Sequence, residues 1–426
     1  MAQAPNLRSN RRSLFTHGLL FGTGVATGGA ATWFGSRVRL DDAPASVVED
    51  VVGGGEERAA PLDLLDRQAA ADAAVVDAME SVTTDVAAQW GPSDSKVADR
   101  KMWVQYDANM TSRLSIDYEN AELWLEAVLR PGETAEAGFE RLKVLGRLAV
   151  RQTSSEAGKE CRILELAARL ATERRLEVDP DAGSASPDEP PMLDGVVDAG
   201  VVESIAPPAT ETATDIDGVE RRKIRVMVPF RGDAQQQLAE RYLADIGKQA
   251  RERNLAPSLI LAMIQTESAF NPRATSPAPA YGLMQLVPTS GGVDAYQFVR
   301  GGKKILEPEF LYMPDMNIKL GSAYLQLLLT RYLRAIDDPQ SRLYSAIAAY
   351  NTGAGNVARA FTGRTSVREA APRINRLSPD QVFAHLRTRL PFEETRTYIR
   401  RVTERQERWR EYDEVLTSMA AAVQAR

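Results

Sequence analysis

Cysteine and histidine are nearly absent from this sequence of 426 residues. Cys161 is the single cysteine, and His17 and His385 are the only histidines. A disulfide framework and a structural Cys/His zinc site are therefore excluded. His385 would have to serve any Ser-His-Asp triad, because His17 lies in an apparent targeting segment, and no GxSxG sequence accompanies it. We expect neither a metal nor a cofactor, and carboxylate chemistry is the leading enzymatic option.

Glycine loops that bind phosphate are also missing. The sequence has no GxxxxGK[ST], and Gly22-Thr23-Gly24 begins a dinucleotide fingerprint whose final glycine is replaced by Thr27. Nucleotide-dependent chemistry is therefore not indicated.

Charge is distributed unevenly along the chain. Residues 231–426 carry 27 Lys and Arg against 20 Asp and Glu, whereas residues 1–230 carry 25 against 38. A basic C-terminal half suits an anionic partner, and a solvated Arg-rich surface is an equal alternative on charge alone. We expect no nucleic-acid partner, and the sequence names no protein partner.

The first 45 residues read as a signal peptide or signal anchor. Arg11-Arg12 precede a weakly apolar stretch, Leu14–Phe34, in a pattern similar to twin-arginine signals. The stretch is just long enough to cross a bilayer as a helix, so it is the candidate membrane contact. Ala43-Pro44-Ala45 offers a cleavage site. We expect export to the periplasm, with cleavage or a retained anchor both open, and a flexible cytosolic tail as the alternative.

The rest of the chain divides into regions that differ in residue pattern and composition. We predict a spacer or first helix over 46–84, a small α+β domain over 85–230 and a separate α domain over 231–426. Within the middle domain, a Pro- and Asp-rich insertion near 178–218 is expected to be disordered.

Strand and helix patterns in the middle domain are distinct. Alternating residues predict strands at Met102–Tyr106 and over Ser112–Leu129, the latter a hairpin turning at Glu119-Asn120. Helices are predicted around Ala135–Val150 and Lys159–Glu177, and Arg221–Phe230 returns to a strand pattern. From Gln235 on, every periodic segment is helical.

One predicted helix ends in an acid. Pro257 suits a first helical turn, and Ile260, Met263 and Ile264 form one apolar face. The next position on that face is Glu267. A carboxyl group buried among apolar side chains has a raised pKa and can act as a general acid. A solvated helix end is the alternative that this window alone leaves open.

Four short motifs in the α domain occur together in a fixed order. They are ESAFNP at 267–272, YGLMQLVP at 281–288, AAYNTGAG at 348–355 and ETRTYIRRV at 394–402. In this order they resemble the catalytic domain of soluble-type (family 1) lytic transglycosylases. WGPSDSKV at 90–97 extends the resemblance toward the membrane-bound murein transglycosylase C branch.

The resemblance implies a mostly α fold, with a lysozyme-like catalytic domain at the C-terminus and a small α+β domain before it. It implies cleavage of the MurNAc–GlcNAc bond of peptidoglycan strands by Glu267, first as acid and then as base. The muramic C6 hydroxyl would close a 1,6-anhydro ring. No carboxylate lies between Ser268 and Val293, which agrees with a mechanism that uses one Glu.

The same resemblance assigns substrate-binding residues. Tyr350 and Tyr398 would hydrogen-bond Glu267 or the sugar, with core aromatics as the alternative. Gln285 and Asn351 would supply amide groups to the sugar, and Ser276 matches the family's loop serine near the cleaved bond.

Two further alternatives stay open: a water-using muramidase of the same fold, and a non-catalytic peptidoglycan-binding scaffold. The related branch is typically lipid-anchored, but no cysteine lies near this N-terminus. We therefore expect no lipoprotein anchor. The arginines of the C-terminal helix and Arg273 would meet peptide carboxylates or solvent.

Overall fold

The computed structural model describes residues 59–160, 189–198, 200–304 and 306–416. The chain divides into two units, Met1–Gly55 and Glu56–Arg426, and all the described residues belong to the second. The predicted targeting stretch Leu14–Phe34 and Cys161 lie outside the described residues, as does most of the helix expected over Lys159–Glu177. No described helix combines the length and apolar character needed to cross a bilayer.

The chain enters the described region through a long helix rather than a spacer. Helix α2 spans Ala59–Trp90. Ala78, Val82 and Val86 are spaced four residues apart and are buried, as is Trp90 at the end of the helix. Such spacing places them on one stripe, so packing of this stripe stabilises the helix. Of the two alternatives predicted over 46–84, a spacer or a first helix, the structure shows the helix from residue 59 on.

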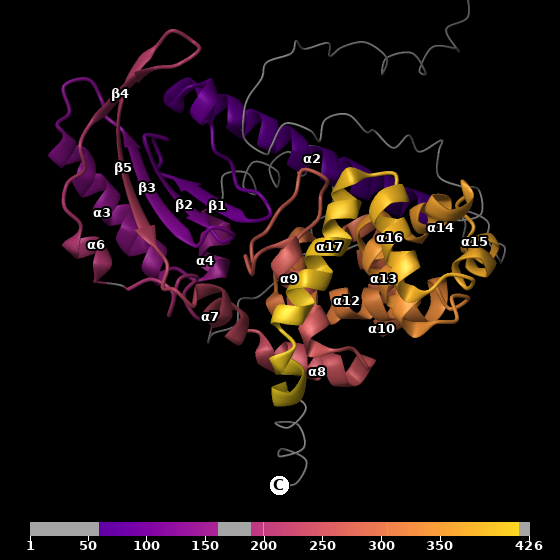
Figure 1. Cartoon of the computed structure of the whole chain (residues 1–426). Coiled ribbons are helices and arrows are strands. Elements are labelled where there is room, and N and C mark those ends of the chain that lie inside the picture. Colours follow the sequence, from indigo (N-terminus) through magenta and orange to yellow (C-terminus); the bar gives the residue numbers. More distant parts are fainter. Residues whose placement is uncertain (1–58, 161–188, 199, 305, 417–426) are drawn as a thin grey trace, which may run out of the picture. The chain divides into compact units, whose positions relative to one another are not determined.

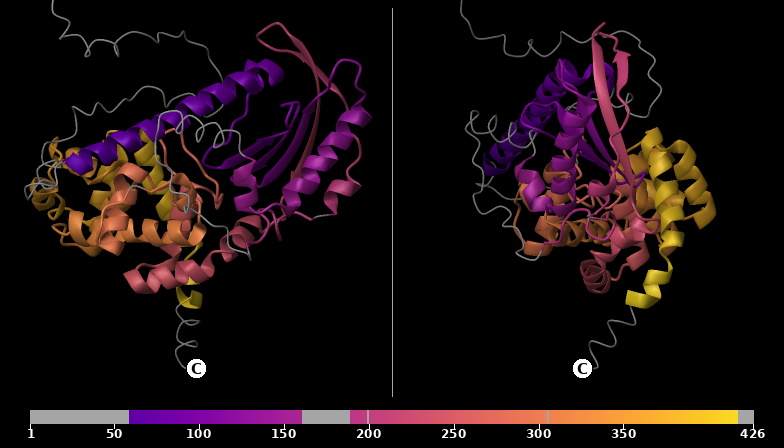
Figure 2. Two further views of the ribbon diagram at one scale, coloured as in Figure 1. Left: turned by 180° about the vertical axis from the view of Figure 1, so that it is seen from behind. Right: turned by 90° about the vertical axis from the view of Figure 1, so that its left-hand side faces the viewer.

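A five-stranded antiparallel sheet follows, in the order β1-β2-β3-β5-β4 (Figure 1). Its strands are β1 Met102–Tyr106, β2 Ser112–Asp117, β3 Glu122–Val128, β4 Glu211–Thr214 and β5 Glu220–Pro229. The predicted hairpin is confirmed, because β2 pairs with β3 across a turn that includes Glu119-Asn120. Helix α3, Ala135–Arg151, packs on one face of the sheet (Figure 2) and confirms the helix expected there.

The expected disorder near 178–218 is wrong for the part that the structure describes. Residues 178–188 lie outside it, but residues 189–198 and 200–218 include helix α6, Val201–Ser204, and strand β4. The physical reason is that Met192 and Leu193 are buried in the main core together with Val196, Val197 and Val202. The Pro- and Asp-rich flanks hid this short apolar sequence. A small helix, α4, spans Ser154–Lys159 and follows α3 directly.

A buried ion network fixes the start of the sheet region. The fully buried guanidinium of Arg113 contacts Glu126 at 2.8 Å and Asp94 at 2.5 Å, and lies 3.8 Å from the Trp90 ring centroid. Lys223 on β5 also contacts Asp94, at 2.6 Å. Asp94 belongs to the short 3-10 turn η2, Pro92–Asp94. The network therefore fixes the chain just before the segment that enters the candidate site.

Every element described after β5 is helical, as predicted. Two π-helical turns, η3 Pro288–Gly292 and η4 Leu328–Tyr332, join the α-helices. The helices are α7 Ala234–Glu240, α8 Leu243–Arg253, α9 Pro257–Glu267, α10 Val293–Arg300, α11 Pro308–Leu311, α12 Pro314–Leu327, α13 Pro339–Thr352, α14 Ala354–Thr362, α15 Val367–Ile374, α16 Pro379–Arg389 and α17 Glu393–Arg408. A mostly α chain with a small antiparallel sheet in its N-terminal part is thus confirmed.

Helix α9 lies deep among these helices and packs along α17 (Figure 1). Ile260, Met263 and Ile264 are buried, but so are Leu259 and Leu261 on other sides of the helix. The predicted single apolar face is therefore too narrow, because α9 is surrounded by protein. A helix enclosed in this way brings its last residue, Glu267, to a fixed position inside the molecule.

Candidate active site

Glu267 is the last residue of α9 and is only 4% exposed. Burial raises the pKa of Glu267 from 4.5 to about 7. Arg100, Tyr398 and Lys101 act in the opposite direction and lower it, whereas Glu394 adds to the rise. The balance leaves a carboxyl group that exists in both its protonated and its ionised form near neutral pH.

Two buried tyrosines accompany Glu267. Tyr398, on α17, interacts with the Glu267 carboxylate. Burial raises the pKa of Tyr398 well above 10, and the negative charge of Glu267 raises it further. The pair lacks the geometry of a regular hydrogen bond, so the buried Tyr398 hydroxyl has no regular partner. Tyr350, on α13, also senses the charge of Glu267, but its hydroxyl donates to the Met284 carbonyl at 2.9 Å. Both tyrosines are therefore neutral at any pH at which Glu267 titrates.

The backbone turns sharply after Glu267. Ala269 and Phe270 both have left-handed φ angles, 50° and 67°, which side chains other than glycine seldom adopt. Ser268 holds this turn, because its hydroxyl donates to the carbonyls of Ile264 and Leu283 at 3.1 and 2.9 Å. The second bond ties the end of α9 to the loop that carries Gln285.

Gln285 is held by its own loop. It is buried with a left-handed φ of 48°, and its Nε2 donates to the carbonyls of Ala274 and Gly282, each at 3.0 Å. The amide oxygen Oε1 is buried and has no hydrogen-bond partner. An unpartnered acceptor in a buried place is costly unless a ligand satisfies it. Gln285 therefore offers a fixed acceptor to an N–H or O–H group.

A cavity of about 330 Å³ lies beside these residues. Its lining includes Gln285, Tyr350 and Asn351, three of the five residues predicted to bind substrate. The remaining residues that line the cavity are Leu286, Val287, Ser290, Gly291, Tyr324, Thr352 and Gly353. Thr395 donates to Oδ1 of Asn351 at 2.6 Å, which orients the amide and leaves its N–H₂ group as the donor.

Ser276 does not line this cavity. It is buried, and its hydroxyl donates to the carbonyl of Ala278 within its own loop. Glu267 and Tyr398 likewise lie outside the lining, although Tyr350 is close to Glu267 and lines the cavity. The structure thus brings Gln285, Tyr350 and Asn351 to one wall and connects that wall to the acid through Tyr350.

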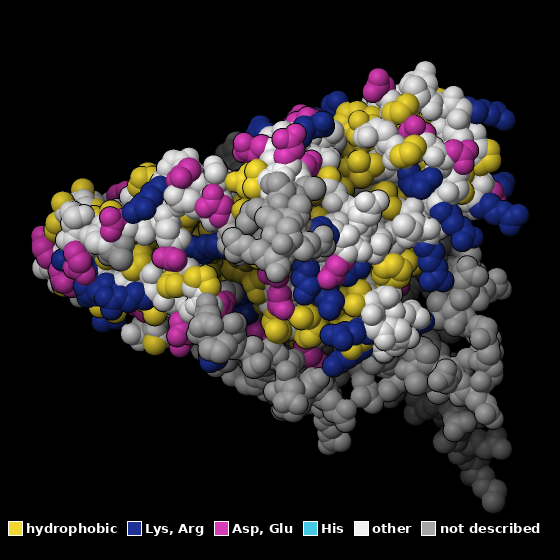
Figure 3. Space-filling model, turned by 90° about the horizontal axis from the view of Figure 1, so that it is seen from below, with side chains coloured by type: hydrophobic (Ala, Val, Ile, Leu, Met, Phe, Trp, Pro, Cys, Tyr) yellow, Lys and Arg dark blue, Asp and Glu magenta, His cyan; other side chains and the backbone are white. Residues whose placement is uncertain are grey.

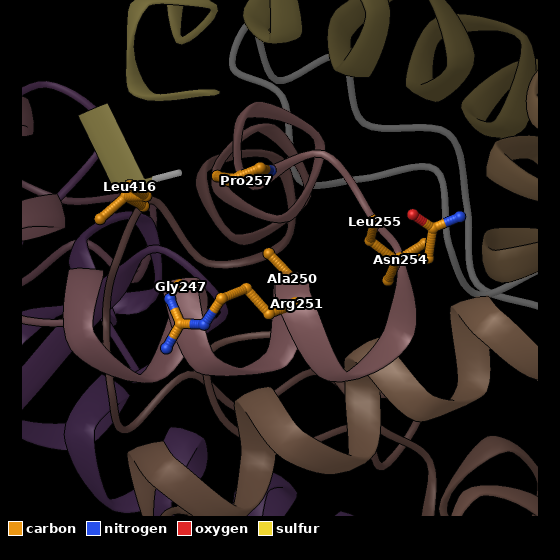
Figure 4. A pocket seen from close by; sticks show the side chains of 7 residues that line it. All are labelled: Gly247, Ala250, Arg251, Asn254, Leu255, Pro257 and Leu416. Carbon is orange, nitrogen blue, oxygen red and sulfur yellow. The ribbon is translucent and has the colours of Figure 1, made fainter. Parts of the chain in front are cut away.

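A second cavity, of about 200 Å³, lies between α8, the start of α9 and Leu416 (Figure 4). Gly247, Ala250 and Leu255 contribute to it, and Arg251 is its charged residue. None of the predicted site residues lines it.

Arg273 was expected to meet peptide carboxylates or solvent, and this is wrong. It is 3% exposed, contacts Glu309 at 3.1 Å and lies 4.1 Å from the Tyr312 ring centroid. Its guanidinium also packs so closely on Gly158 of α4 that a Cβ there would clash. Arg273 therefore joins the helical part to the sheet region and does not face a ligand.

Sequence reasoning missed the charged residues next to Glu267. Arg100 and Lys101 come from the segment before β1, and Glu394 comes from the first turn of α17. Glu394 opens the fourth motif, but nothing in the sequence indicates that its carboxylate lies near Glu267. No local pattern could indicate Arg100, because it reaches the site from the other part of the chain. On the face shown in Figure 3, Lys and Arg side chains gather over the right-hand part, as the basic C-terminal half suggests.

In the described ranges, no three His, Cys, Asp or Glu side chains converge as the ligands of a metal ion would. The candidate site itself offers a buried acid, two tyrosines and fixed amides.

Comparison with known proteins matches two families. Residues 245–371 match the Transglycosylase SLT domain, and residues 69–136 match the N-terminal domain of membrane-bound lytic murein transglycosylase C. A Salmonella arizonae protein named membrane-bound lytic murein transglycosylase C is 43% identical over 172 residues, which cover 40% of this chain and 47% of that protein. A protein of the same name from Histophilus somni is 40% identical over 185 residues, or 43% of this chain and 50% of that protein. The matched region spans about half the length of these relatives. The resemblance found in the sequence is confirmed.

Solved structures match a comparable share of this chain but a smaller share of their own length. An inactive mutant of lytic transglycosylase Slt from Pseudomonas aeruginosa is 28% identical with a TM-score of 0.32, covering 43% of this chain and 25% of that one. The 70-kDa soluble lytic transglycosylase from Escherichia coli is 25% identical with a TM-score of 0.32, covering 40% and 24%.

Proposed function

We propose that this chain, whose residues 245–371 match a transglycosylase SLT domain, cleaves the MurNAc-β-1,4-GlcNAc bond of peptidoglycan without consuming water. The observation that carries the proposal is Glu267, a buried acid with a pKa of about 7 beside two tyrosines and a sugar-sized cavity. General acids work best when their pKa lies near the operating pH. An ordinary exposed Glu, with a pKa near 4.5, would be ionised and could not donate a proton there.

In the first step Glu267 donates its proton to the oxygen that joins the two sugars, O4 of the leaving GlcNAc. The bond between that oxygen and C1 of the muramic acid breaks, and positive charge develops at C1. The acetamido group of the same sugar stabilises this charge, as in substrate-assisted glycosidases. The low exposure of Glu267 supports this step, because burial favours the neutral, protonated carboxyl group that the step needs.

In the second step the Glu267 carboxylate takes the proton from the muramic C6 hydroxyl, and O6 bonds to C1. Glu267 is thereby reprotonated, so the cycle needs no further proton donor. The lowering effects of Arg100, Lys101 and Tyr398 support this step, because they stabilise the carboxylate that the first step creates. The tethered hydroxyl also has a large effective concentration relative to water.

The cavity supplies the groups that would hold the sugars. Its volume of about 330 Å³ is at the lower end of the usual range for ligand pockets, about 300–1,000 Å³. The unpartnered Oε1 of Gln285 would accept from an acetamido N–H or a hydroxyl, and the Asn351 amide would donate. We assign Ser276 to the loop that shapes the cleft, because its own hydroxyl bonds within that loop.

Glu394 is the carboxylate that could instead support hydrolysis. Its Oε1 lies 3.3 Å from Nη1 of Arg100, so its charge is already compensated. Its side chain is 35% exposed, unlike that of Glu267, and it is not among the residues that line the cavity. We therefore propose that Glu267 acts without a second carboxylate.

Product analysis tests the proposal directly. Purified glycan strands are digested in ¹⁸O-water, and the new ends are identified by mass spectrometry. We expect 1,6-anhydromuramic ends, lighter by one water than hydrolysis products and free of the heavy oxygen. Labelled reducing ends would identify a hydrolytic muramidase, and binding without cleavage would identify a scaffold.

We further propose that the protein works in the periplasm, attached to the membrane through Leu14–Phe34. The relatives' name, membrane-bound, supports the membrane association. Fractionation of the envelope tests this: a thioether-linked lipid on the mature N-terminus would contradict it. The domain division at 230/231 also stays a prediction.

A further inference from the structure

The segment before β1 brings a cation to Glu267 from outside the helical part. The carbonyl of Asp99 accepts from the Thr275 N–H at 3.4 Å, and the carbonyl of Arg100 accepts from Nδ2 of Asn271 at 3.3 Å. Asn271 and Thr275 belong to the loop that follows Glu267. The backbone of Arg100 is therefore fixed against the catalytic loop, while its side chain extends to α17.

The side chain of Arg100 reaches α17 one turn away from the catalytic pair. Its Nη1 lies 3.3 Å from Oε1 of Glu394. Glu394 and Tyr398 are four residues apart on α17, so they occupy the same face about 5–6 Å apart. Tyr398 is the residue that interacts with Glu267. The Arg100–Glu394 pair thus lies next to the reacting centre.

This ion pair is accessible to solvent. The Arg100 side chain is 38% exposed and that of Glu394 is 35% exposed. Lys101 is engaged by Glu119, and Glu119 also contacts Arg405 at 2.7 Å. Exposed ion pairs are worth about 0–1 kcal/mol, so a ligand carboxylate can replace one partner at little cost. Arg100 is therefore a cation here that a bound anion can reach. Arg401 on α17 is also exposed, but Arg100 is the one whose backbone is fixed against the loop after Glu267.

The local charge balance favours an anion. Positive charges gather on one side of Glu267, and Lys101 has its pKa lowered to about 7 by burial and then by Arg405, Arg401 and Arg100. A cation beside a general acid works against its protonated form. Within the proposed reaction, the excess positive charge has a use if the substrate itself is anionic next to the cleaved bond.

We propose that Arg100 is a specificity-determining residue of this site. It binds a carboxylate carried by a muramic acid residue, which takes the place of Glu394. The proposal rests on the proposed function. Muramic acid carries a lactyl group on the same sugar whose C1 reacts. That group ends in a carboxylate on bare strands, or is linked to a peptide that carries its own carboxylates. A guanidinium forms two parallel hydrogen bonds to a carboxylate, which fits either source.

The test compares Arg100→Ala with the wild-type chain on three ligands. The first is peptide-bearing strands, the second is strands freed of peptide by an amidase, and the third is a chitin oligosaccharide, which has no carboxylate. KM and kcat are measured for the strands at each variant's pH optimum, and the chitin oligosaccharide is measured as a competitive inhibitor. Binding of all three is also measured in the inactive Glu267→Gln background.

We expect Arg100→Ala to raise KM roughly tenfold for at least one type of strand, because one charge-assisted contact is lost. Any change in kcat follows from the Glu267 pKa and should therefore be the same for both types of strand. Inhibition by the chitin oligosaccharide should be unchanged. An effect limited to peptide-bearing strands identifies a stem carboxylate as the ligand, and an effect limited to bare strands identifies the lactyl carboxylate. Arg100→Lys should recover part of the loss, since it keeps the charge but not the planar fork.

A matched control comes from the helical part. Arg364 forms a comparable exposed ion pair with Glu369, 3.4 Å apart, at the start of α15. Arg364→Ala should leave KM for every ligand unchanged. If it raises KM as much as Arg100→Ala, the effect belongs to surface charge in general and the proposal is wrong.

Two further results overturn the inference. One is an equal loss of affinity for the chitin oligosaccharide, which would mean that Arg100 only holds the loop in shape. The other is unchanged strand affinity for Arg100→Ala in both the kinetic and the binding measurements. Failure of the proposed function looks different: the wild-type chain would not cleave strands, while the binding comparison in the Glu267→Gln background would still decide the role of Arg100.

Discussion

The hydroxyl of Tyr350 donates a hydrogen bond of 2.9 Å to the backbone carbonyl of Met284. This bond places α13 directly against the residue before Gln285. The hydroxyl of the other tyrosine, Tyr398, has no regular partner and lies beside Glu267. Two tyrosines next to the same acid therefore have different tasks, one in supporting a loop and the other in interacting with the charge.

Replacement of each tyrosine by Phe should separate these tasks. Tyr350→Phe leaves a buried carbonyl without its donor, so we expect a loss of unfolding free energy of about 1–3 kcal/mol and a higher KM. Tyr398→Phe removes no regular hydrogen bond, so stability should change by less than about 0.5 kcal/mol. Denaturant unfolding and strand-cleavage kinetics measure both. A larger destabilisation by Tyr398→Phe than by Tyr350→Phe would contradict this assignment.

Glu267→Gln should abolish strand cleavage while it preserves the fold and glycan binding. The amide keeps the shape but has no proton to donate, and loss of a general acid that also serves as base should cost at least about 10³-fold in kcat. Glu394→Gln is the matched control, because it removes a nearby carboxylate from an exposed ion pair. Its kcat should stay within about tenfold of the wild type. Comparable losses in the two variants would point to a two-carboxylate mechanism.

The pH dependence of kcat/KM should report the raised pKa of Glu267. The first step needs the protonated acid, so activity should fall as pH rises through about 7. Arg100 lowers this pKa, and therefore Arg100→Ala should move the falling limb to higher pH. Tyr398→Phe should move it in the same direction. Arg364→Ala serves as the control and should leave the limb in place. A limb near pH 4.5 in the wild type would show that Glu267 is not buried in solution.

Stability should also depend on pH through Glu267. Its pKa is higher in the folded state than the ordinary 4.5, so the folded state binds more protons between pH 4.5 and 7. The part of the stability that comes from protonation of Glu267 is then fully present below pH 4.5 and is lost as pH rises through about 7. Glu267→Gln lacks this loss, so its stability relative to the wild type should increase with pH by about 3 kcal/mol at most. Thermal unfolding of both proteins at pH 5 and pH 8 measures the difference.

Two glycines with similar backbone angles should respond differently to alanine. Gly282 has φ +76°, and a Cβ there would clash with the Leu311 carbonyl oxygen and with Nδ2 of Asn317. Gly132 has φ +77° with nothing within 4 Å. Gly132→Ala should cost only the left-handed angle, about 1 kcal/mol, whereas Gly282→Ala should cost more than about 2 kcal/mol. Gly282→Ala should also lower activity, since the Gly282 carbonyl accepts from Gln285. Equal losses of stability would show that the close approach at Gly282 relaxes freely.

The sequence predicted those features that depend on neighbours along the chain. Alternation around Glu119-Asn120 predicted the hairpin, and the apolar residues before Glu267 predicted its burial. The sequence could not predict that the Arg273 guanidinium packs against Gly158, since that contact joins segments that are far apart along the chain. Likewise, the Pro- and Asp-rich flanks of Met192 outweighed a short apolar sequence whose partners lie elsewhere.

The candidate site shows the same limit. Motif order predicted Gln285, Tyr350 and Asn351, and the structure places them on one cavity wall. Arg100 was invisible to that reasoning, because its approach to Glu394 depends on how the sheet region docks on the helices. Periodicity reports which side of an element is apolar, but long-range pairing of charges leaves no periodic signal.

The strand order of the sheet has a consequence for how the protein is made. Strand β5 pairs with β3, although the whole stretch from Leu129 to Val219 separates them in sequence. During synthesis β3 therefore emerges with one edge open, and its neighbour arrives only when translation has passed Pro229. Pairings between distant segments form slowly, and an open edge invites association with other chains. Arg100 in turn needs Asn271 and α17, which are translated later still. The chain that carries Glu267 thus completes its candidate site only after nearly all of it has left the ribosome, so a partly made molecule lacks the contacts that hold Arg100 and Tyr398 beside Glu267.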